Sequence, residues 1–180
     1  MAYILDSSSL ITPFHQKQLA SLALARGWPP DEAQTKLEDF LAKGISQGLL
    51  RVAREVHEEV MEGKGPSADF LKSMRGKYEL LEPDEETLAY AAEVVEFVRN
   101  HYEPHYENPF ADGADPYLLA YARQHGFVLV SEERSYIPEL DNPIPGVNAK
   151  IQGPPKLPFL AFVYKVKCIS LMTLLVERGW

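Results

Sequence analysis

Four short stretches rich in apolar residues predict strands, and the first and third of them are uninterrupted apolar runs. They cover residues 3–5, 49–52, 127–130 and 166–169. The first run ends at Asp6, and the third follows Gly126, a residue well suited to end a helix. The chain is therefore expected to contain a sheet whose strands are widely separated in sequence.

Between these runs, apolar residues recur at helical spacing. The clearest helix begins near Pro83-Asp84, carries acids in its first turn and repeats apolar positions from Leu88 to Val98. The other predicted helices cover residues 30–43, 54–62, 67–75, 112–125, 157–164 and 171–177. Residues 137–158 are rich in proline, glycine and asparagine and predict a long loop. This alternation of strands and helices predicts a single α/β domain over residues 1–180, built on a parallel sheet.

Length and composition fit a globular protein of one domain. The chain has 180 residues, of which 46% are apolar and 24% are charged. No apolar run approaches the roughly 20 residues that cross a bilayer, and no signal-peptide pattern opens the chain. The single cysteine, Cys168, excludes an internal disulfide and a zinc site with several cysteines. We therefore expect a cytoplasmic protein with no membrane association.

Acidic residues give the first candidate for chemistry. The formal net charge is −8, so the chain lacks the overall basic charge that usually drives nucleic-acid affinity. Asp6 directly follows the first predicted strand, and Glu133 follows the third. Asp115 lies in the first turn of the helix that leads into the third strand. Because ligands of open parallel sheets gather at the carboxyl ends of the strands, these acids are expected at one edge.

Further acids accompany these three. Glu58 and Glu59 lie on the helix after the second predicted strand, and Asp112 lies one helical turn before Asp115. Mg²⁺ or Mn²⁺ bound by such oxygen ligands can lower the pKa of a water molecule and stabilise both oxygens of a phosphodiester displacement. Taken singly, each acid also has a structural explanation, as a helix cap, a first-turn acid or a solvated surface charge.

Four stretches carry a resemblance to the PIN domain family, named for the PilT N-terminus: YILDSSSLI, REVHEEV, ADPYLLAYARQHGFVLVSEE and VKCISLMTLL. More narrowly, the chain resembles a prokaryotic branch of PIN-like domains of unknown function. The third stretch is the most specific, because an Asp that opens an apolar helix, then Gly, an apolar strand, a hydroxyl residue and an acid form a distinctive succession. The resemblance implies a three-layer α/β/α fold with a central parallel sheet of four to five strands.

The resemblance also implies a metal-dependent endoribonuclease, often the toxin of a type II toxin–antitoxin pair. It implies four catalytic residues that also bind Mg²⁺ or Mn²⁺: Asp6, Glu59, Asp115 and Glu133. It further implies four supporting residues: Ser8, Glu58, Asp112 and Ser131. The chain departs from the family in opening with Asp-Ser-Ser rather than Asp-Thr-Asn or Asp-Thr-Ser, and in having Glu133 where many relatives have Asp.

We therefore expect an enzyme that cuts RNA, with an antitoxin protein as a partner; homodimerisation is compatible with the same resemblance. Two alternatives stay open, a catalytically inactive PIN-like binding module and a metal-dependent phosphatase. The sequence contains no Gly-rich phosphate loop, no Gly-x-Ser-x-Gly and no HExxH motif. It therefore does not resemble nucleotide triphosphatases, serine hydrolases or zinc proteases.

Two other stretches could contact RNA. Residues 101–110, HYEPHYENPF, could stack on bases, although a loop packed on the protein body is the simpler interpretation. A modest basic stretch could bind phosphates, although solvated helix charge is the simpler interpretation. Its members are Lys64, Lys72, Arg75 and Lys77.

Overall fold

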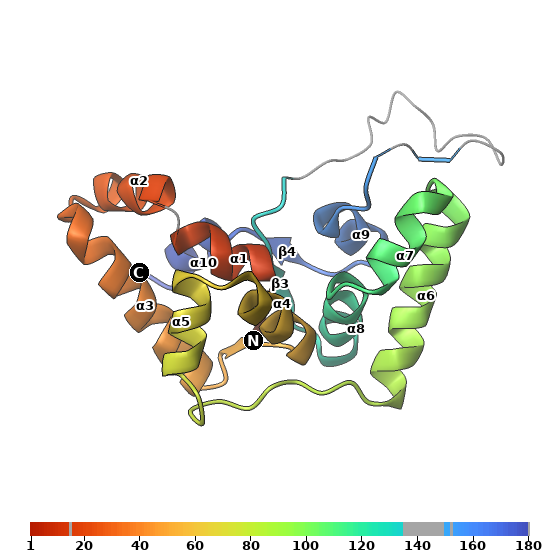
Figure 1. The fold of residues 1–180 in the computed structure, drawn as a ribbon, viewed down its shortest axis with the longest axis horizontal. Coiled ribbons are helices and arrows are strands. Elements are labelled where there is room, and N and C mark those ends of the chain that lie inside the picture. Colours follow the sequence, from red (N-terminus) through yellow and green to blue (C-terminus); the bar gives the residue numbers. More distant parts are fainter. Residues whose placement is uncertain (15, 135–149, 152, 180) are drawn as a thin grey trace.

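The fold is built on a four-stranded, all-parallel sheet (Figure 1). The computed structural model describes residues 1–14, 16–134, 150–151 and 153–179. The strands are β1 (Tyr3–Leu5), β2 (Leu50–Arg51), β3 (Val128–Val130) and β4 (Cys168–Ile169), in the spatial order β2-β1-β3-β4. The central strands β1 and β3 contain only buried apolar residues, because the layers of helices cover both of their faces.

Helices make up most of the remaining described chain (Figure 1). They are α1 (Ser7–Ile11), α2 (Gln16–Arg26), α3 (Pro30–Ser46), α4 (Arg54–Gly63), α5 (Pro66–Ser73), α6 (Glu85–His101), α7 (Glu107–Ala111), α8 (Asp115–His125), α9 (Leu157–Val163) and α10 (Leu171–Glu177). Two short 3-10 turns, η1 (Thr12–Phe14) and η2 (Pro104–Tyr106), precede α2 and α7. Within these described residues, no helix combines the length and apolar content needed to span a bilayer.

Local sequence explains where the main helices begin and end. Asp84 caps α6, since its side chain accepts a hydrogen bond from the Thr87 backbone N–H at 2.8 Å. Ser170 caps α10 in the same way through Thr173. Gly126 ends α8 with a left-handed backbone, φ 67°, and the chain then enters β3. Helix α6 packs along α8, so both helices share one side of the core (Figure 1).

The approach of α3 to the sheet depends on a glycine. A Cβ atom added at Gly44 would lie 2.6 Å from the Leu50 side chain, far inside a van der Waals contact. Leu50 is 1% exposed and belongs to the core. The absence of a side chain at Gly44 therefore lets α3 pack directly against the first residue of β2.

The structure confirms the α/β fold with a parallel sheet and corrects several boundaries. The helix expected over residues 112–125 begins at Asp115, because Asp112 ends α7 by donating its backbone N–H to Asn108 at 3.0 Å. Residues 104–111, most of which belong to the aromatic stretch interpreted as a packed loop, instead form η2 and α7. Helix α9 confirms the helix expected from residue 157, so the predicted loop ends before Leu157 instead of extending to residue 158; most of that loop lies outside the described residues.

Candidate functional site

The carboxyl edge of the sheet brings together the residues that follow β1 and β3. Leu5 pairs with Val130 in the parallel register, and the Asp6 N–H donates to the Val130 carbonyl at 2.9 Å. The Ser131 N–H donates to the Ile169 carbonyl on β4 at 3.0 Å. Asp6 and Ser131 therefore leave the sheet side by side, at the edge where parallel sheets place their ligands. Asp6 is almost fully buried there, with 4% of its surface exposed.

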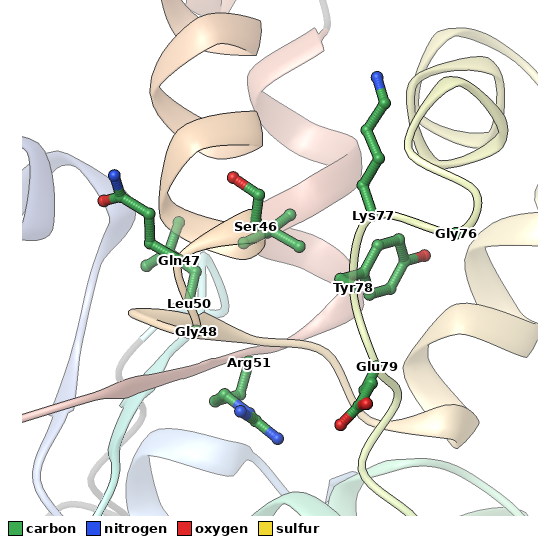
Figure 2. Close-up of a pocket in the computed structure, with 10 residues that line it drawn as sticks. Ser46, Gln47, Gly48, Leu50, Arg51, Gly76, Lys77, Tyr78 and Glu79 are labelled. Carbon is green, nitrogen blue, oxygen red and sulfur yellow. The ribbon is translucent and has the colours of Figure 1, made fainter.

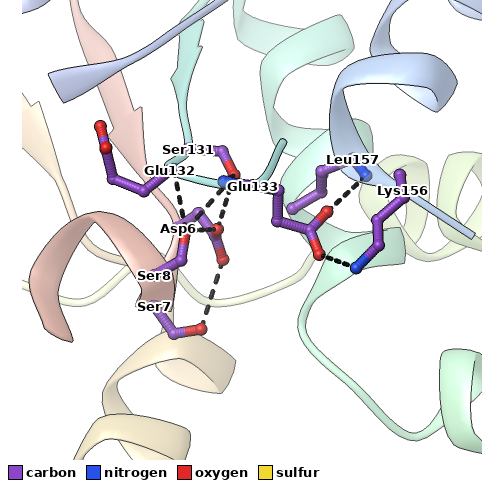
Figure 3. A network of polar contacts seen from close by, with 8 residues as sticks. All are labelled: Asp6, Ser7, Ser8, Ser131, Glu132, Glu133, Lys156 and Leu157. Carbon is purple, nitrogen blue, oxygen red and sulfur yellow. Dashed lines mark hydrogen bonds and ion pairs between the residues drawn. The ribbon is translucent and has the colours of Figure 1, made fainter. Parts of the chain in front are cut away.

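Two serine hydroxyls hold the Asp6 carboxylate (Figure 3). Ser8 Oγ donates to Asp6 Oδ2 at 2.5 Å, and Ser131 Oγ donates to the same oxygen at 2.8 Å. The backbone after β3 closes the network, because the Glu132 N–H donates to Ser8 Oγ at 2.9 Å and the Glu133 N–H donates to Ser131 Oγ at 3.1 Å. The two serines named from the sequence thus connect the ends of β1 and β3 through Asp6.

Glu133 is bound by two donors from the start of α9 (Figure 3). Lys156 Nζ donates to Glu133 Oε1 at 2.7 Å, and the Leu157 N–H donates to Oε2 at 2.8 Å. The neighbouring Glu132 instead accepts a hydrogen bond from the Leu171 N–H at 2.7 Å, at the start of α10. The two adjacent glutamates therefore accept hydrogen bonds from the starts of different helices, and only Glu133 lies with the other acids.

Glu59 and Asp115 come together at the start of α8. Glu59, on α4, accepts a hydrogen bond from the Ala114 N–H at 3.0 Å, and Asp115 is the first residue of the helix. An acid in the first helical turn is favoured by the helix dipole. The contact brings the middle of α4 beside the acid that opens α8, so a third and a fourth chain segment reach the site.

Two other acids named from the sequence lie on the outside of the molecule. Glu58 is exposed and lies 3.8 Å from the Arg54 guanidinium, one helical turn away. Asp112 is exposed and follows the last turn of α7. The structure thus places Glu59 and Asp115 at the site and leaves Glu58 and Asp112 exposed, although the members of each pair are close in sequence.

The site is electrostatically strained by its own negative charge. Burial raises the pKa of the Asp115 carboxyl well above its ordinary value, and the carboxylates of Asp6, Glu133 and Glu59 raise it further. The Lys156 ammonium acts in the opposite direction. Burial also raises the pKa of Asp6, although the hydrogen bonds from the two serines lower it. Four carboxylates from four segments therefore influence one another, which is the condition under which a bound cation stabilises a site.

The donors suit a hard divalent ion, but their arrangement is not that of a complete metal centre. Carboxylate and hydroxyl oxygens are the ligands that Mg²⁺ and Mn²⁺ prefer. Among the residues that the structure describes, no three His, Cys, Asp or Glu side chains are grouped so that they could hold a metal ion. Both carboxylate oxygens of Glu133 are bound by donors of the chain itself. Metal binding through Glu133 Oε1 therefore competes with the Lys156 ion pair.

Comparison with protein families identifies the domain. The family model DUF4411, described as a domain of unknown function, matches residues 3–180. The chain belongs to the DUF4411 family. No curated protein and no solved structure matches it. The match spans all four strands of the sheet and every acid of the candidate site, so these acids are part of the DUF4411 domain itself.

One residue of this DUF4411 site, Lys156, has no counterpart in the sequence-based prediction. It is separated from Glu133 by 23 positions and follows a stretch rich in proline and glycine. The only local signal is Pro158, since proline is typical of the first turn of a helix. That signal predicts where α9 begins, but only the fold places this helix start against the third strand.

The aromatic stretch of the DUF4411 chain packs against the protein body. The His101 ring stacks on Phe97 with 4.2 Å between ring centroids, and its Nδ1 lies 2.8 Å from the Phe97 carbonyl. Tyr102 is only 2% exposed. These two residues are therefore better explained by packing than by base stacking.

Proposed function

We propose that this DUF4411 domain is an endoribonuclease of the PIN-like type that depends on Mg²⁺ or Mn²⁺. The observation that carries the proposal is the electrostatic coupling at the carboxyl edge: burial raises the pKa of Asp115, and the carboxylates of Asp6, Glu133 and Glu59 raise it further. Several carboxylates that are buried or partly buried in one place are costly unless a cation offsets their repulsion, and perturbed pKa values of this kind cluster at functional sites. The parallel sheet and the resemblance to PIN domains support the same assignment.

In the proposed site, Asp6, Glu59, Asp115 and Glu133 hold the divalent ion. When bound, the ion supplies the means to activate a water molecule and to neutralise charge on the scissile phosphate.

Side chains around these acids have positioning roles. Ser8 and Ser131 fix the orientation of the Asp6 carboxylate, as partners of metal-binding side chains commonly do. Lys156 lies beside the same acids, and its ammonium can contact a phosphate oxygen once Glu133 releases it.

Cleavage assays test the proposal directly. RNA should be cut in the presence of Mg²⁺ or Mn²⁺ and not in EDTA. Asp6→Asn and Asp115→Asn should each lower the rate by about a hundredfold or more, since even partners of metal ligands are worth 10- to 100-fold. Asp112→Asn is the matched control, because it removes an exposed acid three positions before Asp115. Full activity in both active-site variants would refute the assignment.

The neighbouring pair on α4 offers a second matched comparison. Glu59→Gln removes a carboxylate that faces the start of α8, whereas Glu58→Gln removes the exposed carboxylate beside Arg54. Only Glu59→Gln should weaken metal-dependent cleavage. Equal effects of the two substitutions would indicate that the position of Glu59 beside Asp115 has no role in the reaction.

A catalytically inactive binding module is the second candidate. It is favoured by the hydrogen bonds from Lys156, Leu157 and Ala114 that occupy oxygens of two of the four acids. An inactive module predicts that Mn²⁺ does not raise the melting temperature, whereas an ion bound only by the native state must raise it. Parallel assays with RNA, DNA and a simple phosphate ester distinguish a ribonuclease from a metal-dependent phosphatase.

The proposal includes a role as the toxin of a type II toxin–antitoxin pair, which rests on the PIN resemblance. Expression of the chain alone should then arrest growth, and Asp115→Asn should not. An antitoxin that binds over the acidic edge should shield Asp6 and Glu133 from solvent and suppress RNA cleavage. Growth arrest by the Asp115→Asn variant would separate toxicity from catalysis and count against this role.

A further inference from the structure

A cleft of about 420 Å³ lies away from the candidate metal site (Figure 2). One wall is the end of α3 and the start of β2, and the other is the segment 76–79 that follows α5. Because α3 leads into the first residue of β2, the cleft lies at the amino edge of the sheet. Asp6 and Ser131 follow the last residues of β1 and β3, so the two sites occupy opposite edges.

The Arg51 guanidinium is the decisive group in this cleft. It lies on the edge strand β2 and against the turn after α3, where a Cβ added at Gly48 would lie 3.5 Å from Nη1. Its Nε is shielded from solvent and has no hydrogen-bond partner in the part of the chain that the structure describes. A guanidinium keeps its charge, and a buried donor without an acceptor costs free energy. No ion pair within the described residues holds the guanidinium, and because Arg51 lines the cleft, its amino groups rather than the enclosed Nε can meet an anionic acceptor from outside the chain.

Other lining residues favour a phosphorylated ligand with an aromatic base. Tyr78 is half-buried and offers both a ring face and a hydroxyl that can donate a hydrogen bond. Lys77 is exposed, and Gln47 supplies an amide that can donate and accept. In Figure 2, Arg51 and Lys77 extend in opposite directions, with Tyr78 between them. Arg51 is thus placed to bind a phosphate, while the exposed Lys77 adds positive potential on the other side of Tyr78.

The charge of the cleft differs from that of the whole chain. Its lining contains two cations, Arg51 and Lys77, and one carboxylate, Glu79, in a chain with net charge −8. We infer that the cleft binds a nucleoside monophosphate, with its phosphate on Arg51, its base against Tyr78 and its ribose hydroxyls on Glu79. The volume lies within the range of roughly 300–1,000 Å³ that is typical of small-molecule sites. Free nucleotides and the 5′-phosphate end of an RNA carry the same chemistry.

Isothermal titration calorimetry on the full chain in EDTA tests this inference separately from the nuclease proposal. The probes are AMP and UMP, the nucleosides adenosine and uridine, inorganic phosphate, and a short RNA with or without a 5′-phosphate. The nucleotides should bind, and the nucleosides should bind at least about tenfold more weakly, since hydrogen bonds to charged groups are worth about a tenfold change or more. Binding of phosphorylated RNA but not of AMP or UMP would assign the site to an RNA end and overturn the free-nucleotide assignment.

Two substitutions at Arg51 and two controls make the test specific. Arg51→Met should lower nucleotide affinity at least about tenfold, and Arg51→Lys should restore only part of it, because an ammonium lacks the two-pronged geometry of a guanidinium. Lys72→Met should have no effect, since Lys72 pairs with Asp69 on the exposed side of α5. Asp115→Asn should bind nucleotides as the wild type does, even if it is catalytically inactive.

Three further results would overturn the inference. The wild-type chain could fail to bind any phosphorylated probe, or a folded Arg51→Met variant could bind nucleotides with unchanged affinity. Inorganic phosphate or the nucleosides could also bind as tightly as the nucleotides, which would remove the case for a nucleotide. Thermal unfolding of each variant in parallel identifies a loss of binding that comes from a loss of fold.

Discussion

Replacing Lys156 by methionine should change stability and metal binding in opposite directions. Methionine keeps much of the aliphatic length of lysine but removes the ammonium that donates to Glu133 Oε1 at 2.7 Å. Without metal, Glu133 keeps its hydrogen bond from the Leu157 N–H and loses its ion-pair partner, so the free energy of unfolding should fall. With Mn²⁺, the ion no longer competes with an internal ammonium, so its affinity should rise.

The geometry of the ion pair sets the magnitude. Unit charges 2.7 Å apart interact by about 6 kcal/mol at an effective dielectric constant of about 20, and by about 1.5 kcal/mol in bulk water. The Lys156 and Glu133 side chains are 36% and 22% exposed, so solvent screening reduces the net value to about 1 kcal/mol. The melting temperature in EDTA should therefore fall by roughly 2–4 °C, and the Kd for Mn²⁺ should decrease about fivefold.

Denaturant unfolding in EDTA and calorimetric titration with Mn²⁺ measure the two effects. Lys72→Met is the matched control, because it removes one positive charge whose Nζ lies 3.0 Å from Asp69 on an exposed helix face. It should leave the affinity for Mn²⁺ unchanged. Weaker or unchanged Mn²⁺ binding by the Lys156→Met variant would refute the reasoning that this lysine competes with the ion.

Three further substitutions test the site and the packing. Because the pKa of Asp115 is raised, the native state binds more protons than the unfolded state above the ordinary value of about 3.9, and stability is lost as the pH rises through the raised pKa. Asp115→Asn should therefore gain stability relative to wild type as the pH rises above about 4 in EDTA; a pH-independent difference in urea unfolding contradicts this. Ser131→Ala removes a donor to Asp6 and the acceptor of the Glu133 N–H, so urea unfolding should show a loss of about 1–3 kcal/mol. Gly44→Ala should cost about 1–3 kcal/mol in the same assay, because its Cβ meets Leu50 at 2.6 Å; a neutral effect would show that α3 can move away from β2.

The parallel sheet could be predicted because its central strands are continuous apolar runs. The buried strands β1 and β3 contain no charged residue, and each is followed by a polar residue that ends the run. The edge strands β2 and β4 are only two residues long, and β2 includes Arg51. Their limits are therefore set by hydrogen-bonded pairing with the central strands rather than by an apolar sequence pattern. Helix α2 has no amphipathic stripe, which is why the apolar pattern does not predict it.

At the site, too, some features follow from the local sequence and others depend on long-range contacts. The position of Asp6 and Ser131 follows from strands that end in acids and hydroxyls, and the helix start at Asp115 is close to the expected one. Whether Glu58 or Glu59 faces the site depends on the rotation of α4 against α8, which sequence spacing alone leaves open. The Lys156 contact depends on how the chain returns to the sheet after residue 134, and no local pattern encodes that path.

The central claim is that the carboxyl edge of the sheet binds a divalent ion through acids from separate segments. Calorimetric titration of Mn²⁺ into the full chain tests it most directly, with Asp6→Asn and Asp115→Asn compared with the exposed control Asp112→Asn. We predict binding by the wild type and the control, and at least about tenfold weaker binding by the two site variants. Absence of Mn²⁺ binding by the wild type, or equal affinity in all four proteins, would contradict the claim.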